Sequence, residues 1–102
     1  MTRRYLLAPE AALDLVRIWR YIKRQSTVET ADRVESAIRD AIVFLAENPG
    51  TGHRREQLTD ETVKFFPVYS YLIVYRPATK PLQVVAILHG HRDVERILRG
   101  RR

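Results

Sequence analysis

Residues that could carry chemistry gather after an apolar run near the C-terminus of the sequence. The run VVAIL (84–88) leads into His89-Gly90-His91-Arg92-Asp93, and two earlier apolar runs contain Lys64 and Arg76. Polar residues at the end of a buried strand are common positions for functional sites. If these cations share one face of a sheet, they could bind phosphate groups or stabilise the pentacovalent phosphate of an RNA-cleavage reaction.

RNA cleavage also requires a general acid and a general base near the cations. Tyr71 and Tyr75 alternate onto the same strand face as Ile73, a pattern more typical of packing than of catalysis. Arg92 and Asp93 could instead form a local pair that caps the following helix. The residues alone leave both the catalytic and the structural interpretation of this segment open.

The sequence predicts no metal site and no cofactor. It has no cysteine, and among His53, His89 and His91 only His91 has a neighbouring carboxylate, that of Asp93. His89 is more typical of a strand-end histidine that bonds to backbone than of a ligand. The sequence also has no phosphate-binding glycine loop, no HExxH and no G-x-S-x-G motif.

Length and composition predict one globular domain over residues 1–102. Hydrophobic residues make up 45% of the chain and charged residues 29%, which are ordinary values for a folded domain. No apolar run approaches the roughly 20 residues of a membrane helix, and the N-terminus lacks the apolar stretch of a signal peptide. Together with the absence of cysteine, these features favour a cytoplasmic protein that does not associate with membranes.

The net charge of +6 is unevenly distributed along the sequence. Residues 1–50 contain eight Lys and Arg against seven Asp and Glu, whereas residues 51–102 contain ten against five. A basic surface of this kind can simply keep a protein soluble, or it can bind RNA, DNA or an acidic protein surface. Charge alone leaves these alternatives open.

The N-terminal part of the sequence predicts a strand followed by a helix. Arg3 to Ala8 is a short apolar run that Pro9 ends, and Pro9 suits the first position of a helix that continues from Glu10 to about Arg24. Asp14 and the arginines lie away from the apolar side of this helix. The residues expected to face the core are Ala12, Leu15, Val16, Trp19 and Ile22.

A second helix is expected to begin at a capping box formed by Ser26 and Glu29. It runs to about Glu47, where Asn48-Pro49-Gly50 ends it. Because so short a break separates the two helices, they must form an antiparallel hairpin whose shared apolar face covers a sheet. The core residues expected in the second helix are Ala31, Val34, Ile38, Ala41, Ile42 and Leu45.

Three strands are expected in the second half, at residues 63–66, 71–76 and 82–89. The linking segments 67–70 and 77–81 are short and contain all three remaining prolines, so the strands should form an antiparallel meander. A short amphipathic helix follows. The predicted order is β-α-α-β-β-β-α, an α+β domain in which a helical hairpin packs on a small, mainly antiparallel sheet.

Two surfaces are candidates for binding partners. Exposed apolar residues off the core stripes of the hairpin predict a surface covered by an amphipathic segment, with the two aromatic residues as anchors; they are Leu13, Tyr21, Val43 and Phe44. Phe44 is close enough to the core stripe to belong to the core instead. Near the C-terminus, Arg92, Arg96 and Arg99 recur on one face of the last helix, while Val94, Ile97 and Leu98 face the sheet.

The C-terminal arginines predict either a target-binding face or a solubilising tail. Residues 92–102 contain five arginines, at 92, 96, 99, 101 and 102, against two acidic residues. Such a face suits an acidic protein patch or DNA phosphates. His91 and Lys64 complete the candidate target-binding residues.

Several segments resemble toxins of the RelE/ParE superfamily from bacterial type II toxin–antitoxin systems. The resemblance covers nearly the whole chain and includes LLAPEAALDLVRIWRYI, AIVFLAENPGTGH and VKFFPVYSYLIVYR. Its most specific part is VVAILHGHRD, an apolar strand that ends in H-G-x-R-D and resembles the ParE branch. Ala8 stands where these proteins usually have a serine, a difference that removes a helix cap.

The resemblance implies a cytoplasmic toxin that is neutralised by a small ParD-like antitoxin. The C-terminal segment of the antitoxin would wrap the helical hairpin and the sheet in a toxin–antitoxin hetero-oligomer, and DNA would be contacted only through the antitoxin. The best-known ParE-like toxins inhibit DNA gyrase by binding it, so gyrase is the target that the resemblance implies.

RelE-like members of the superfamily instead cut mRNA on the ribosome. They use lysines and an arginine on the middle strands, an arginine after the last strand and a C-terminal tyrosine. Arg92 matches the arginine after the last strand, and Lys64 lies near one of the lysines. Leu72 stands at the middle-strand arginine, and Leu98 or Ile97 at the tyrosine. The resemblance therefore favours a binding toxin over a ribosome-dependent endoribonuclease, with a non-toxic antitoxin-binding homologue as a third alternative.

Overall fold

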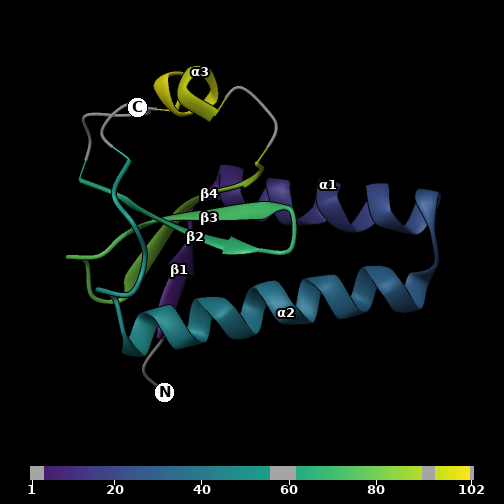
Figure 1. The fold of residues 1–102 in the computed structure, drawn as a ribbon, viewed down its shortest axis with the longest axis horizontal. Coiled ribbons are helices and arrows are strands. Elements are labelled where there is room, and N and C mark those ends of the chain that lie inside the picture. Colours follow the sequence, from purple (N-terminus) through teal and green to yellow (C-terminus); the bar gives the residue numbers. More distant parts are fainter. Residues whose placement is uncertain (1–3, 56–61, 91–93, 102) are drawn as a thin grey trace.

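The computed structural model describes residues 4–55, 62–90 and 94–101, which form three layers (Figure 1). The middle layer is a sheet of β1 (Tyr5–Leu7), β2 (Lys64–Val68), β3 (Tyr71–Arg76) and β4 (Leu82–His89). A hairpin of α1 (Pro9–Gln25) and α2 (Val28–Glu47) covers one face, and α3 (Val94–Arg99) lies on the other. The predicted α+β order and the helical hairpin are confirmed. None of the described helices is long and apolar enough to cross a membrane.

The strand order in the sheet is β1-β4-β3-β2. The predicted antiparallel meander of β2, β3 and β4 is confirmed, and β1 adds a parallel edge strand whose place the sequence did not predict. Because β1 pairs only with Leu82–Val84, the second half of β4 has no strand on that side. The helix α1 lies against β4 there (Figure 1).

A β-bulge in β4 decides which of its side chains face the helical hairpin. Val74 pairs with Ala86 whereas Tyr75 pairs with Val84, so Val85 is one extra residue. Before the bulge the even-numbered residues of β4 belong to the core under the hairpin, and after it the odd-numbered residues do. The bulge thereby turns the end of β4, including His89, toward the hairpin.

The core face of α1 differs from the predicted stripe. Val16 was expected to be buried and is 44% exposed, whereas Asp14 was expected to be exposed and is buried. Trp19 lies at the side of α1 that faces α2, where its indole N–H donates to Asp32 at 2.8 Å. The buried residues centre on one narrower arc, because α1 packs between α2 and β4; they are Ala11, Asp14, Leu15 and Ile18.

The predicted capping box of α2 is wrong by one residue. Ser26 ends α1, where its N–H donates to the carbonyl oxygen of Ile22 at 2.8 Å. The N-cap is Thr27, whose hydroxyl accepts the N–H of Thr30 at 3.0 Å. The predicted core residues of α2 are confirmed, since all of them are buried or pack against the core.

The segment expected to be a turn at 67–70 is shorter than predicted. The strand β2 continues through Pro67 to Val68, and only Tyr69 and Ser70 form the turn. Phe65 exchanges both backbone hydrogen bonds with His53 on the outer side of β2. The backbone nitrogen of Pro67, two residues later, faces the same outer side. The missing N–H of Pro67 therefore breaks no bond to β3 and helps to block the sheet edge.

Candidate functional site

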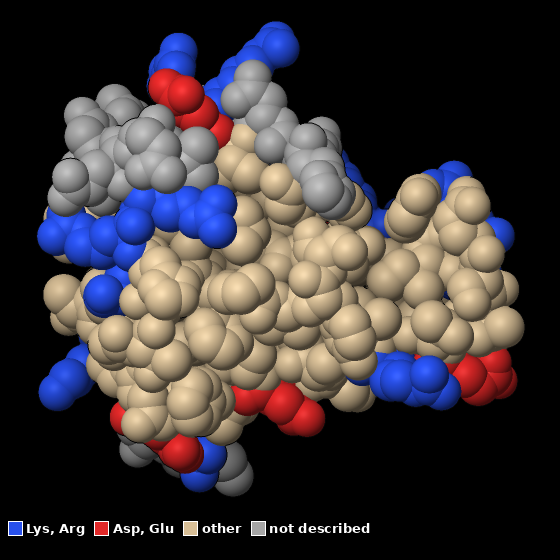
Figure 2. All heavy atoms as spheres, viewed as in Figure 1, with Lys and Arg blue, Asp and Glu red and all other residues tan. Residues whose placement is uncertain are grey.

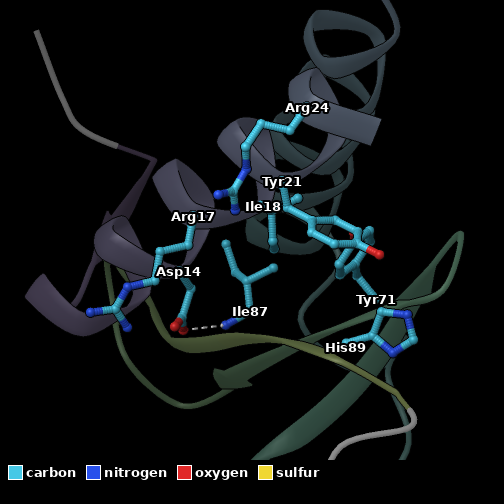
Figure 3. Close-up of a pocket in the computed structure, with 8 residues that line it drawn as sticks. All are labelled: Asp14, Arg17, Ile18, Tyr21, Arg24, Tyr71, Ile87 and His89. Atoms are coloured by element: carbon cyan, nitrogen blue, oxygen red, sulfur yellow. Dashed lines mark hydrogen bonds between the residues drawn. The ribbon is translucent and has the colours of Figure 1, made fainter. Parts of the chain in front are cut away.

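A groove opens between α1, the start of β3 and the end of β4 (Figure 3). Its volume is about 450 Å³. The residues that α1 contributes recur three and four positions apart, so one side of the helix forms a wall of the groove. The lining residues are Asp14, Arg17, Ile18, Tyr21, Arg24, Tyr71, Ile87 and His89.

Asp14 forms part of this groove and also completes the edge of the sheet. Its carboxylate accepts the backbone N–H of Ile87 at 3.0 Å (Figure 3). The strand β1 has already ended at this level, so a side chain of α1 supplies the acceptor that a neighbouring strand would have supplied. The carboxylate is buried, with 7% of the side chain exposed.

Arg101 pairs with Asp14 and joins the end of the chain to α1. The guanidinium donates two hydrogen bonds to the Asp14 carboxylate, at 2.6 and 2.8 Å, and its Nε lies 2.9 Å from a carboxylate oxygen of Glu10. The hydrogen bonds that Arg101 donates to Asp14, and to a lesser degree the charges of both carboxylates, raise the pKa of Arg101 above its ordinary value despite its burial. The sequence counted Arg101 among the five arginines of the basic C-terminal end, and the structure shows that its side chain turns inward, with 14% exposed.

The end of the groove holds two aromatic side chains. The ring of His89 packs edge-on against the ring of Tyr71, with centroids 5.4 Å apart. Burial raises the pKa of Tyr71, and the nearby Tyr21 adds to this shift. Tyr71 therefore keeps its proton at neutral pH. The prediction that Tyr71 and Tyr75 are packing residues is confirmed, because both are buried.

Tyr75 holds the loop that follows α2. Its hydroxyl donates to the carbonyl oxygen of Pro49 at 2.8 Å and accepts the N–H of Gly52 at 2.9 Å. Lys64, a predicted target-binding residue, donates to the carbonyl oxygen of Gly52 at 3.3 Å. Lys64 pairs with Tyr75 of β3, so these two side chains lie on the same face of the sheet. Arg76 follows Tyr75 in the strand and therefore lies on the opposite face from Lys64. These two residues therefore do not meet the condition under which the cations could bind phosphate together, namely that they share one sheet face.

The Tyr75 hydroxyl makes stability depend on pH in the alkaline range. Burial raises the pKa of Tyr75, although the hydrogen bond from Gly52 opposes the shift. Because the folded state holds this proton more tightly, its contribution is fully present below the unfolded pKa of roughly 10 and is lost as the pH rises through the folded pKa. We expect the free energy of unfolding, measured in urea between pH 8 and 12, to fall less steeply in Tyr75→Phe. Equal slopes for both proteins would contradict this assignment.

The second half of α1 carries a basic surface that the charge count by halves concealed. Arg17, Arg20 and Arg24 form no ion pair within the described residues, and Lys23 lies over the ring of Trp19, 5.3 Å from its centroid. The acidic residues that nearly cancel the positive charge of residues 1–50 lie on α2 and on the first turns of α1. Like charges three and four residues apart destabilise a helix by about 0.2–0.5 kcal/mol per pair. The helix dipole offsets this cost only in the last turn.

The four predicted partner-binding residues lie at different places on the helical hairpin. Tyr21 is 52% exposed and lines the groove over β4. Phe44 is 45% exposed and packs against Phe66 of the edge strand β2, with ring centroids 6.3 Å apart. Leu13 is exposed on another side of α1, about 80° from Tyr21 around the helix axis. Val43 is only partly exposed.

The short helix α3 presents its basic side to solvent, as predicted. Val94 and Leu98 are buried against the sheet, and Ile97 packs beside them. Arg96 and Arg99 are exposed, and Arg99 pairs with Glu95 at 2.8 Å. The other two candidates of this surface, residues 91 and 92, lie outside the described residues. Figure 2 shows one face of the molecule with a broad neutral surface in its middle and basic side chains mainly at its margins.

Two positions bear on the ribonuclease alternative. By the resemblance, Leu72 stands where RelE-like toxins have an arginine, and Leu98 or Ile97 where they have a tyrosine. Leu72 and Leu98 are buried in the core between the sheet and α3, and Ile97 packs beside them. None of these side chains can donate a proton or bind a phosphate.

Comparisons with known proteins agree with the observed fold. A family model described as the ParE toxin of the type II toxin–antitoxin system parDE matches residues 5–94. The solved structure titled "Chromosomal ParDE TA system from P. aeruginosa" contains a chain that is similar with a TM-score of 0.72 and 20% identity. The match covers 83% of this chain and 92% of that chain. No curated protein matches this sequence.

Proposed function

The chain belongs to the ParE toxin family of type II toxin–antitoxin systems, and from this premise we propose that it binds and inhibits DNA gyrase in the cytoplasm and is neutralised by a ParD-like antitoxin. The observation that carries the proposal is the family match over residues 5–94. The buried Leu72 and Leu98 favour a toxin that acts by binding over one that cleaves RNA, because a general acid and a phosphate-binding cation are missing at these positions.

The antitoxin is proposed to cover the apolar residues of the helical hairpin in a hetero-oligomer, and to be the only component that contacts DNA. Tyr21 and Phe44 are the proposed aromatic anchors, since aromatic side chains commonly dominate the binding energy of an interface. Their separation between β4 and β2 would require a segment that passes over both helices. The exposed Leu13 and the partly exposed Val43 would lie under or beside it.

Replacing both anchors tests this partner. Tyr21→Glu combined with Phe44→Glu is expected to weaken antitoxin binding at least 100-fold, because each anchor contributes about 2 kcal/mol or more. Binding of the purified product of the adjacent antitoxin gene can be measured by calorimetry. The matched control is Val28→Glu with Tyr69→Glu, which places the same charges at two other exposed apolar residues. Unchanged affinity in a folded Tyr21/Phe44 variant would contradict the proposed docking surface.

The target is proposed to contact the basic side of α3 and the residues just before it. Arg92→Glu combined with Arg96→Glu is expected to abolish growth inhibition on induction and gyrase inhibition in a supercoiling assay, while antitoxin binding is retained. The charge-matched control is Arg33→Glu with Arg54→Glu, two exposed arginines elsewhere. Toxicity that persists at wild-type expression levels would exclude this surface and direct attention to residues 51–61. Codon-position mRNA cuts that disappear in Arg92→Ala would favour the ribonuclease alternative.

A further inference from the structure

The groove beside α1 combines an apolar floor with cations at its rim. Ile18, Tyr71 and Ile87 are buried core residues whose surfaces line the groove, and Tyr21 is half exposed above them. In the view of Figure 3 the two arginines and the two tyrosines lie on opposite sides of the isoleucines. An apolar side chain that entered the groove would therefore contact isoleucine and tyrosine side chains. The residues next to it in the same bound segment would lie near the arginines.

Among the described residues that line the groove, the one carboxylate is already paired, and the groove is therefore electrically positive. Asp14 lines the groove, but Arg101 binds both of its oxygens and Ile87 donates to one of them. Arg17 and Arg24 have no ion pair among the described residues. Within the described part of the groove, an anionic ligand thus meets two guanidinium groups without an ion pair and no unpaired carboxylate.

We propose that this groove binds a short acidic segment of a partner protein, which inserts one apolar side chain over Ile18 and Ile87 and places carboxylates against Arg17 and Arg24. The proposal rests on the proposed function, since it identifies this partner with the antitoxin. It assigns the recognition of charge to Arg17 and Arg24. These two arginines are therefore specificity-determining residues in addition to the exposed apolar anchors.

The shape and polarity of the groove favour a protein segment over a nucleic acid. A volume of about 450 Å³ is enough for a few side chains, and ligand sites of this size are typically lined by apolar residues with a few polar groups. A phosphate backbone would use the arginines but would leave the isoleucine floor uncovered. Guanidinium groups bind carboxylates with two parallel hydrogen bonds, which gives the pair directional as well as electrostatic selectivity.

The test compares two variants with the same change in net charge. Arg17→Glu with Arg24→Glu reverses the charge in the groove, whereas Arg20→Glu with Arg33→Glu reverses two exposed arginines that do not line it. The affinity for the purified product of the adjacent antitoxin gene is measured by calorimetry at 50 and 300 mM salt. We expect the groove variant to bind at least 100-fold more weakly at low salt, and the control to stay within threefold of wild type.

Two further readings make the result specific. The affinity of wild type should fall as salt is raised, whereas that of the groove variant should rise, because its attractive charge pairs have become repulsive ones that salt also screens. Lysine substitution of acidic residues in the antitoxin, one at a time, should restore part of the affinity to the groove variant. Circular dichroism and thermal unfolding establish that each variant is folded, and Arg17→Lys with Arg24→Lys should bind better than the glutamate pair.

The outcomes separate this inference from the proposed function. If wild type binds the antitoxin and the folded groove variant binds it within threefold, the groove proposal is overturned and the antitoxin partnership stands. If wild type does not bind the antitoxin, both proposals fail. If the groove variant keeps antitoxin binding but loses binding to a labelled RNA or DNA 20-mer that wild type binds, the groove is a nucleic-acid site and the proposal is overturned.

Discussion

Replacing Arg101 with alanine is expected to lower the free energy of unfolding by about 3 kcal/mol. The substitution would leave the carboxylate of Asp14, of which 7% is exposed, without its cation in a poorly hydrated position. A buried charge that loses its partner is strongly destabilising, because the desolvation cost remains after the attraction is gone. The remaining hydrogen bond from Ile87 offsets only part of that cost.

The matched control for this prediction is Arg99→Ala, two residues earlier. Arg99 also pairs with a glutamate, but its side chain is 65% exposed, so its removal should change the free energy of unfolding by less than about 0.5 kcal/mol. Urea unfolding followed by circular dichroism measures both values. For a domain of this size, the loss expected for Arg101→Ala corresponds to a thermal unfolding midpoint lowered by more than about 10 °C. Arg99→Ala should leave the thermal midpoint nearly unchanged.

A double-mutant cycle separates the pair from its surroundings. Asp14→Ala removes the partner of Arg101 and also the acceptor for the Ile87 N–H, so it should destabilise at least as much as Arg101→Ala. The double variant should be more stable than the sum of the two losses predicts, because the second change removes a charge that the first left unpaired. Additive losses, or an Arg101→Ala variant as stable as Arg99→Ala, would show that the pair contributes little.

The sequence predicted the elements of this fold better than their packing. Alternation and turn residues indicated β2, β3 and β4, and short loops allowed little besides an antiparallel meander. The pairing of β1 with β4 joins residues 5–7 to residues 82–84, and no local pattern encodes a contact across that distance. The bulge at Val85 was equally hidden, because one extra residue leaves an apolar run looking continuous.

The helical periodicity predicted that Asp14 would be exposed, because a periodic pattern places charged residues on the solvent side of a helix. Its burial depends on Arg101, 87 residues away, and on a sheet edge that exists only because β1 is short. The groove was missed for the same reason, since its residues come from α1, β3 and β4. The basic side of α1 was hidden by counting charges along the chain. That count adds the acidic residues of α2 to the arginines of α1, although Arg17, Arg20 and Arg24 form no ion pair within the described residues. Tyr21, by contrast, was identified as exposed from its place off the core stripe alone.

The second large effect is expected at Gly52, where alanine should lower the free energy of unfolding by about 2–3 kcal/mol. A Cβ at this position would lie 2.6 Å from the hydroxyl oxygen of Tyr75, 2.9 Å from its ring and 3.0 Å from the carbonyl oxygen of Phe65. Neither neighbour moves easily, because the Tyr75 ring is fully buried and the Phe65 carbonyl accepts the N–H of His53. The backbone of Gly52 does not have a positive φ, so the cost is one of space alone.

Gly50→Ala is the matched control, because a Cβ there would meet no atom within 4 Å. It should change the free energy of unfolding by less than about 1 kcal/mol. The change should be stabilising if its main effect is to lower the conformational entropy of the unfolded chain. A second background tests the cause. Tyr75→Phe removes the nearest atom to the new Cβ, so Gly52→Ala should destabilise this variant less than it destabilises wild type. Equal losses in both backgrounds would mean that the Tyr75 hydroxyl does not set the requirement for glycine, and that the ring of residue 75 and the Phe65 carbonyl do.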